Sequence, residues 1–325
     1  MRTLRLPSRA SRLGVLLPLL AALTACSVLP GNGQRQPTGR AVIASGGTQG
    51  VYYAYAGTLA ERLEEAAPEL DVEVASTAGS VENLRRLAAG NAAFAFTAAD
   101  VAADAVNGAA PFGRRLPLAA VSRVYDDYMH LVVAATSPIR TMRDLAGRTV
   151  SIGPAGSGTA VIVERLFSVS GLEPRSVHSV QLGINESVDA LRKGQVDAFF
   201  WSGGLPTSGV QSLSNEMPLR LVPLGGLAPA MQDKFGSVYH QAAVPAGTYG
   251  LADQVDTIAV PNFLVCREDT DPALVEQVVA TLFRSREMIA STVPAAGALD
   301  GRTAIQTGPV RLHPAAEEWF RDTKP

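Results

Sequence analysis

The sequence is poor in the residues that most often carry chemistry. Its 325 residues include two cysteines and four histidines, and the histidines are scattered without a metal-binding or catalytic motif. Cys26 lies near the N-terminus, so Cys266 is the one thiol of the body and an internal disulfide is excluded. Because Cys266 lies in an apolar run, a buried and inert thiol is expected. The core must therefore hold the fold together, and no cofactor or metal ion is expected.

Strong charge of either sign is also missing. The net charge is -2, which gives no reason to expect nucleic acid as a partner. Hydrophobic residues make up 47% of the chain and charged residues 18%, which are ordinary proportions for a globular protein. A chain of 325 residues is long enough for two domains, each with its own core. We expect a monomer.

The N-terminal segment has the features of an export signal. Residues 1–12 carry four arginines and no acid, and the apolar stretch 13–23 that follows is too short to span a bilayer as a lasting helix. Leu23-Thr24-Ala25-Cys26 resembles the bacterial lipobox, in which the cysteine is lipidated and becomes the mature N-terminus. We therefore predict a signal peptide over 1–25 and a lipidated Cys26 with a flexible tether over 26–40. The body is expected outside the cytoplasm, anchored by lipid to a membrane.

Short β-type runs alternate with helical runs along the rest of the chain. The periodicity predicts strands at 41–44, 72–75, 94–96, 149–152, 177–182 and 198–201, and helices at 52–66, 81–89, 98–106, 159–170, 186–193 and 209–215. Two apolar runs, 118–124 and 129–135, are separated by a polar turn at 125–128. A long helix over 271–289, expected to pack on the first lobe, and a short one at 315–321 follow. This alternation predicts two α/β lobes with parallel sheets.

Glycine-rich turns join several of these strands to helices. Gly153 to Thr159 resembles a Walker loop, but Thr159 occupies the place of the lysine that nucleotide binding requires. Turns at 45–50 and 77–80 follow the first two strands. Because ligands of such sheets gather at the carboxyl ends of the strands, and helix N-termini attract anions, we expect the turns to share one anion-binding cleft. The alternative is that the helix entries merely need small residues.

Two proline-containing crossovers are candidate hinges between the lobes, at 134–139 and 257–264. They divide the body into lobe 1, residues 41–133 plus 262–325, and lobe 2, residues 134–261. Arg123 lies near a strand end and is expected to form a surface or hinge ion pair.

The ordered motifs of the body resemble the TAXI family of solute receptors for tripartite (TRAP) transporters. The resemblance covers about residues 40–322 and rests on the following segments: Gly46 to Tyr53, Gly79 to Leu84, Gly156 to Thr159, Gly194 to Phe200, Pro245 to Tyr249 and Leu312 to Pro314. It implies a periplasmic-binding-protein fold of class II type, with two α/β domains joined by two hinge strands. It also implies TRAP permease subunits as partner, and acidic or amide amino acids or dicarboxylates as ligands.

The predicted ligand-binding residues come from the turns and from this resemblance. Gln49 and Trp201 depart from the usual family pattern and bring an amide and an indole to the cleft. Asp100 can bind a ligand ammonium or simply occupy the first turn of a helix, and helical phase does not decide between Tyr52 and Tyr53. The predicted set is Gly47, Thr48, Gln49, Tyr52, Ser80, Asn83, Asp100, Ser157, Gly158, Thr159 and Trp201.

Other classes of function have less support. No nucleophile elbow occurs, and Ser157 has no assignable base, so the protein is not expected to be an enzyme. Asp126, Asp127 and His130 form the nearest metal-like cluster, but adjacent carboxylates usually face different ways, and a solvated turn is expected there. The alternative function is a lipid-anchored sensor that delivers its closed form to a membrane signalling protein such as a sensor kinase.

Overall fold

The computed structural model describes residues 36–325. The predicted signal peptide, the lipidated Cys26 and most of the predicted tether lie outside the described residues. The end of that tether is corrected, because Gly39 and Arg40 already belong to the first strand. Among residues 36–325, no helix combines the length and the apolar character that crossing a membrane requires.

The strands form one sheet of ten strands. They are β1 (Gly39–Ala44), β2 (Leu70–Ala75), β3 (Phe94–Ala98), β4 (Leu118–Ala134), β5 (Thr149–Ser151), β6 (His178–Val180), β7 (Ala198–Gly203), β8 (Leu219–Leu221), β9 (His240–Val244) and β10 (Val255–Arg267). Their order is β2-β1-β3-β10-β4-β7-β5-β6, with β8 paired to β4 and β9 to β10. The strands at each side are parallel, as predicted, whereas β4 and β10 pair antiparallel at the centre.

The helices alternate with the strands at both ends of the sheet. They are α1 (Val51–Ala66), α2 (Ser80–Ala88), α3 (Ala99–Asn107), α4 (Gly158–Ser170), α5 (Ile184–Arg192), α6 (Ser208–Glu216), α7 (Ala228–Phe235), α8 (Pro272–Arg284), α9 (Arg286–Thr292), α10 (Gly301–Ala304) and α11 (Pro314–Thr323). Short 3-10 turns occupy Met142–Leu145, Pro174–Ser176, Gly225–Leu227, Thr248–Gly250 and Pro294–Ala298. We call the part built on β1, β2 and β3 lobe 1 and the part built on β5, β6 and β7 lobe 2.

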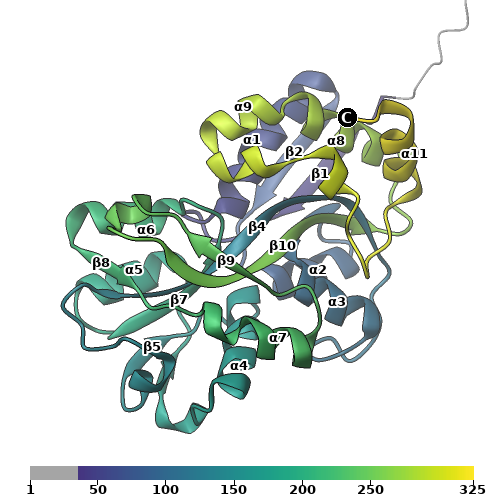
Figure 1. Cartoon of the computed structure of the whole chain (residues 1–325). Helices are drawn as coiled ribbons and strands as arrows, with labels where there is room; N and C mark the ends of the chain where they lie inside the picture. Colours follow the sequence, from purple (N-terminus) through teal and green to yellow (C-terminus); the bar gives the residue numbers. More distant parts are fainter. Residues whose placement is uncertain (1–35) are drawn as a thin grey trace, which may run out of the picture. The chain divides into compact units, whose positions relative to one another are not determined.

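β4 and β10 run through both lobes, as Figure 1 shows at the centre of the molecule. β4 pairs with β10 as far as Tyr128, and with β7 of lobe 2 from Tyr128 to Val132. The polar turn predicted at 125–128 is therefore wrong, because these residues continue a single strand. The chain enters lobe 2 within β4, ahead of the predicted crossover at 134–139. In β10 the register shifts after Asn262, inside the predicted crossover at 257–264.

Two helix predictions also need correction. The predicted helix over 271–289 is interrupted at Ser285, which separates α8 from α9. Asp271 caps α8, because its side chain accepts a hydrogen bond from the backbone N–H of Ala273 at 2.9 Å. The helix predicted at 81–89 begins one residue earlier, since Gly79, with φ of 123°, is the N-cap of α2 and Ser80 is the first helical residue. A glycine suits that position because other residues rarely adopt such a φ.

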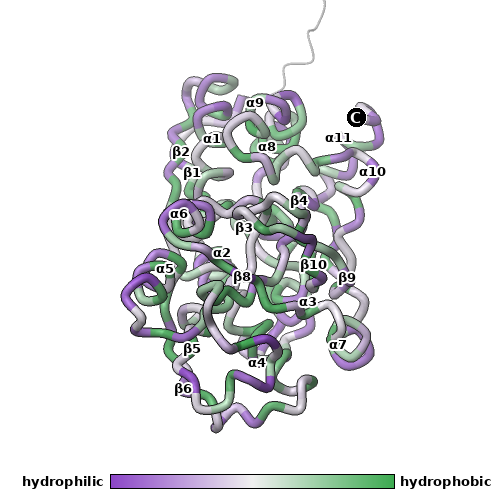
Figure 2. The backbone as a smooth tube through the Cα atoms, turned by 60° about the vertical axis from the view of Figure 1, so that its left-hand side comes forward, coloured by the Kyte–Doolittle hydropathy of each residue, from purple (hydrophilic) through white to green (hydrophobic). Residues whose placement is uncertain are grey.

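Three hydrophobic clusters form the core of the described residues. One includes side chains of both lobes, such as Val101 of α3 and Leu166 of α4. A second joins α1 to α8, so α8 packs on lobe 1 as predicted, and a third lies under α5 and α6 of lobe 2. Figure 2 shows polar and apolar stretches alternating along α5 and α6, as expected for helices with one buried face. Cys266 is fully buried, and burial raises the pKa of its thiol to about 12.

Asn83 of α2 makes hydrogen bonds to the segments at the carboxyl ends of β1, β2 and β3. Its amide nitrogen donates to the backbone carbonyls of Ser45 and Phe96 at 2.6 Å and 2.9 Å, and its amide oxygen accepts from Thr77 at 2.6 Å. The side chain has no exposed surface. Asn83 therefore holds the turns after β1 and β2 against the end of β3, which fixes the wall of lobe 1 that faces lobe 2.

We predict that Asn83→Ala lowers the free energy of unfolding by about 2 kcal/mol, because it leaves buried carbonyls without their donors. Urea denaturation of the mature protein measures this change. Asn91→Ala, at an exposed position after the same helix, serves as the control and is expected to stay within about 0.5 kcal/mol of the wild type. Equal midpoints for the two variants would contradict the structural role of Asn83.

Candidate functional site

The predicted glycine-rich turns meet around one cavity between the lobes, with a volume of about 70 Å³. Lobe 1 contributes residues of the turns after β1 and β2, and lobe 2 contributes the turn after β5 and the end of β7. The lining residues are Gly46, Gly47, Gly50, Val51, Tyr52, Thr77, Ala78, Gly79, Ser80, Ala98, Tyr125, Asp127, Pro154, Ser157, Gly158, Thr159, Gly183, Ile184, Trp201, Ser202 and Gly203. The expectation that the three turns share one surface is confirmed.

Five helices begin at the wall of this cavity. The N-cap residues of α1 to α5 all line it, and they are Gly50, Gly79, Ala98, Ser157 and Gly183. Three of the helices belong to lobe 1 and two to lobe 2. Each helix has at least nine residues, so each presents the positive end of a macrodipole to the cavity.

Few side chains cap these helices. The Ser157 hydroxyl accepts a hydrogen bond from the backbone N–H of Ala160 at 3.0 Å, whereas the other four N-caps make no side-chain cap hydrogen bond in the described structure. N–H groups in the first turn of a helix have no partner within the helix. A ligand with a negatively charged group can take the place of the missing caps.

The start of α2 in lobe 1 contacts the turn before α4 in lobe 2 beside the cavity. The N–H of Glu82 in α2 donates to the carbonyl of Gly156 at 3.0 Å. Gly158 lies so close to Ser80 that a Cβ on Gly158 would be 2.9 Å from the Ser80 hydroxyl oxygen. Any other residue at 158 would force the Ser80 side chain of the facing lobe to move. The Gly153 to Thr159 turn therefore serves both as ligand wall and as contact surface between the lobes.

Seven of the eleven predicted ligand-binding residues line the cavity, and four do not. The lining ones are Gly47, Tyr52, Ser80, Ser157, Gly158, Thr159 and Trp201. Thr48 and Gln49 are exposed and contact lobe 2. The Thr48 hydroxyl accepts a hydrogen bond from the Asn185 side chain at 3.1 Å, and the backbone carbonyl of Gln49 accepts one from the Ser208 hydroxyl at 2.7 Å. Asn83 has the structural role described above.

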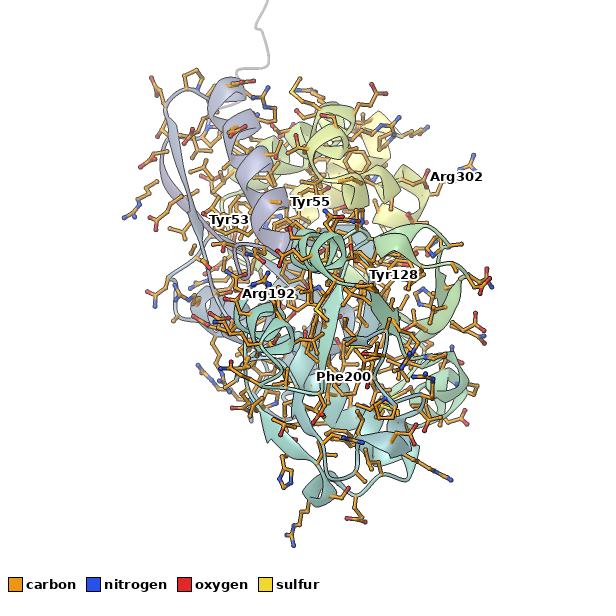
Figure 3. All side chains as sticks on the ribbon, turned by 90° about the vertical axis from the view of Figure 1, so that its left-hand side faces the viewer. Tyr53, Tyr55, Tyr128, Arg192, Phe200 and Arg302 are labelled. Atoms are coloured by element: carbon orange, nitrogen blue, oxygen red, sulfur yellow. The ribbon has the colours of Figure 1, made fainter. Side chains whose placement is uncertain are left out.

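Tyr52 is the tyrosine of its pair that faces the cavity. Its hydroxyl donates to the Asn262 side-chain oxygen, and its ring stacks on Phe96 with 5.4 Å between ring centroids. Burial, together with the nearby Asp127 carboxylate, raises the pKa of Tyr52 well above its usual value. Tyr53 is half-buried, and Figure 3 shows it on a different side of α1 from the buried Tyr55.

Asp100, the fourth residue outside the lining, is engaged by lobe 2. It lies in the first turn of α3, and its Oδ2 accepts from the Tyr239 hydroxyl at 2.6 Å and from Arg165 of α4 at 3.2 Å. Arg165 also donates to Asp104 at 2.5 Å. Burial raises the pKa of Asp100, and Arg165 and Tyr239 oppose that shift. The carboxylate is thus occupied by an interlobe ion pair.

The sequence analysis missed an acidic residue in the cavity. Asp127 lies on β4, is 4% exposed, and its Oδ2 accepts a hydrogen bond from Ser202 of β7 at 3.0 Å. Its other oxygen, Oδ1, makes no hydrogen bond within the described structure. Burial raises the pKa of Asp127 to about 7, although Ser202 and Asn262 act in the opposite direction. The adjacent Asp126 points elsewhere and pairs with Arg123 at 2.7 Å, which confirms the expected ion pair of Arg123.

Trp201 connects the cavity wall to the interior of lobe 2. Its indole N–H donates to the Thr207 hydroxyl at 3.0 Å, and the Thr207 N–H donates to the Tyr249 hydroxyl at 2.8 Å. His130 Nε2 lies 3.1 Å from that same hydroxyl. Burial lowers the pKa of His130 to about 4, so the ring is neutral near pH 7. These bonds fix the indole as a rigid wall.

The arrangement offers no catalytic or metal-binding set among residues 36–325. No histidine lines the described cavity, and the Ser157 hydroxyl is engaged as the cap of α4 and hydrogen-bonds to no basic side chain of the described residues. Asp126 and Asp127 face different partners and His130 lies beside Tyr249, so these three residues do not converge. The described residues contain no group of three or more potential ligands placed for a metal ion.

Two solved structures share this arrangement of strands and helices. A protein of Bordetella bronchiseptica RB50 is 18% identical with a TM-score of 0.51, over 87% of this chain and 88% of that chain. The alkanesulfonate-binding protein SsuA from Xanthomonas axonopodis pv. citri, bound to MOPS, is 18% identical with a TM-score of 0.51, over 88% of this chain and 84% of that chain. The fold is the two-lobed α/β fold of periplasmic binding proteins, as the sequence predicted.

The sequence itself matches one protein family over most of its length. The match, to the NMT1-like family, covers residues 43–323. It begins in β1 and ends at the last residue of α11, so it includes every residue that lines the cavity. The chain therefore belongs to the NMT1-like family.

Proposed function

We propose that this protein is an extracytoplasmic solute-binding receptor that captures a small solute with a negatively charged group between its lobes. The observation that carries the proposal is the convergence of five helix N-termini, from both lobes, on one cavity. Free backbone N–H groups and macrodipoles attract an anion without any arginine or lysine. The structural relative from Xanthomonas is an alkanesulfonate-binding protein, which supports solute capture by this fold.

The finer assignment rests on the sequence. The ligand is an amino acid such as glutamate or glutamine, or a dicarboxylate, and the partner is the permease of a TRAP-type transporter. Resemblance to TAXI receptors supports both statements, and the TAXI assignment stays a prediction beside the NMT1-like match. Lipid on Cys26 anchors the receptor to the membrane, and no catalytic step takes place.

Binding and closure are coupled in this proposal. The lobes follow the predicted division, lobe 1 from residues 41–133 and 262–325 and lobe 2 from 134–261, except that lobe 1 begins with β1 at Gly39 and the chain already enters lobe 2 within β4. Bending takes place in the central parts of β4 and β10. The change of partner at Tyr128 and the register shift after Asn262 support bending there. A ligand that contacts N-termini of both lobes favours the closed form because only that form supplies both sets of contacts. The closed form then docks on the membrane partner.

A thermal-shift screen tests solute capture directly. Mature protein is heated with each of a panel of amino acids, dicarboxylates and 2-oxo acids. A ligand at 100 times its dissociation constant adds about 2.7 kcal/mol to the free energy of unfolding, so a clear rise in Tm is expected for at least one class. The absence of any shift with every acid tested would count against the proposed function.

A second prediction concerns the contact at Gly158. Gly158→Val places branched carbon atoms against Ser80 of the facing lobe, where even a single Cβ would lie 2.9 Å from the hydroxyl oxygen. We expect ligand affinity, measured by calorimetry, to fall at least tenfold because the cleft no longer closes. The melting temperature without ligand should change little.

Gly57→Val is the matched control. Gly57 lies in α1, and a Cβ there would meet no described atom within 4 Å. This variant carries the same change of side chain and should bind the ligand as the wild type does. If Gly158→Val also bound with wild-type affinity, the turn from Gly153 to Thr159 would not be part of the binding site.

A further inference from the structure

The cavity has two chemically different poles. One pole consists of the five helix N-termini, which favour negative charge. The other is Asp127, the only residue with a carboxylate in the lining of the described cavity. The same lining contains no arginine, lysine or histidine. A site built for anions alone has no use for a buried carboxylate, because two negative charges in one closed space repel each other.

Asp127 has an unused acceptor. Its Oδ2 is bound to Ser202, but Oδ1 is buried and makes no hydrogen bond in the described structure. The hydroxyl of Tyr125, two residues earlier on β4 and also in the lining, is buried and faces the Asp127 carboxylate. A buried carboxylate oxygen is normally hydrogen-bonded, so Oδ1 of Asp127 points to a donor that the protein itself does not supply.

The nearest positive charges are engaged elsewhere. Arg123 pairs with Asp126 at 2.7 Å, and the neighbouring His240 ring also contacts Asp126, with Nε2 3.3 Å from its Oδ2. Asp126 adds its own negative charge to the surroundings of Asp127. The other groups facing Asp127 are the neutral side chains of Ser202 from β7, Asn262 from β10, Tyr52 from α1 and Tyr125 from β4 itself. Within the described residues, the protein supplies no cation to the free oxygen of Asp127.

We propose that Asp127 selects the ligand, and that the ligand is a small zwitterion whose ammonium group lies against Asp127 Oδ1 while its carboxylate lies at the helix N-termini. The inference rests on the proposed function and narrows it to α-amino acids or similar amphoteric solutes. Dicarboxylates and other acids without an ammonium group bind more weakly above the pKa of Asp127, because their second acidic group then meets an ionised carboxylate instead of a donor. Tyr125 supplies a further hydroxyl at the ammonium pole.

The test compares pairs of ligands that differ by one ammonium group. Glutamate is paired with glutarate, and glutamine with glutaramate, and affinities are measured by calorimetry on the mature protein at pH 7.5. We expect the amino acid of at least one pair to bind tenfold or more tightly than its partner. A charge-assisted hydrogen bond to a buried carboxylate accounts for a ratio of this size.

Asp127→Asn tests the assignment to this residue. The variant keeps the size of the side chain and an acceptor for Ser202 but loses the charge, so the ratio within each pair should fall at least tenfold. Asp71→Asn is the control, since it makes the same change at an exposed position of β2 that is outside the cavity lining. Its ratio should stay at the wild-type value.

A pH series on the wild-type protein gives a readout that does not depend on any variant. An ammonium beside Asp127 favours the ionised carboxylate, so amino-acid binding should release protons and strengthen as pH rises from 6 to 8. An acid ligand beside Asp127 favours the protonated carboxyl, so its binding should take up protons and weaken over the same range. Calorimetry in buffers with different ionisation enthalpies measures the protons exchanged.

The outcomes separate the two proposals. If the acid of each pair bound as tightly as the amino acid, and Asp127→Asn left the ratios unchanged, the zwitterion inference would be overturned while solute capture stood. If no amino acid or acid bound to the wild type, the proposed function itself would fail. Proton uptake by the tightest ligand would also overturn the inference.

Discussion

The two long strands β4 and β10 are the constraint on which the rest of the structure depends. They lie side by side at the centre of one sheet and extend into both lobes, so they set the direction in which each lobe faces the other. Parallel strands on either side then deliver their helices to the same space, since each helix begins just after the carboxyl end of a strand. Five helix N-termini meet in one cavity as a consequence of this single arrangement.

The cavity offers backbone N–H groups, instead of basic side chains, to a negatively charged ligand group. Helix N-termini stay oriented at little entropic cost because the fold already fixes them, whereas an arginine must be ordered when the ligand binds. The glycine-rich turns let the two lobes approach each other at Gly158 and Ser80. The buried position of Asp127 in this cavity strengthens its electrostatic interactions compared with those of an exposed carboxylate.

Local patterns predicted the parts of the site that local chemistry defines. Strand-to-helix turns with glycines and hydroxyls mark helix N-termini in any context, which is why Ser157, Thr159 and Ser80 were found from the sequence. Asp127 was missed because Tyr125-Asp126-Asp127-Tyr128 between two apolar runs has the composition of a solvated turn. The sequence did contain a signal for a continuous strand, because the two flanking runs are equal in length and both apolar, as the two halves of one long strand would be. For Asp100, the alternative that it occupies the first turn of a helix is confirmed. Its partners Arg165 and Tyr239 could not be found from local sequence, because they come from the opposite lobe.

The ion pair between Asp100 and Arg165 affects how the two lobes align when they close more than it affects the free energy of closure. Both charged groups are largely buried where α3 meets α4, so their attraction is offset by the free energy needed to remove them from water. Separating the lobes would hydrate both groups again, and the net gain from the pair is therefore small. A misaligned closure, in contrast, would leave Asp100 buried without its partner, which is costly. The pair thus rejects wrong alignments, and the free energy that closes the cleft must come from the ligand and from apolar contacts between the lobes.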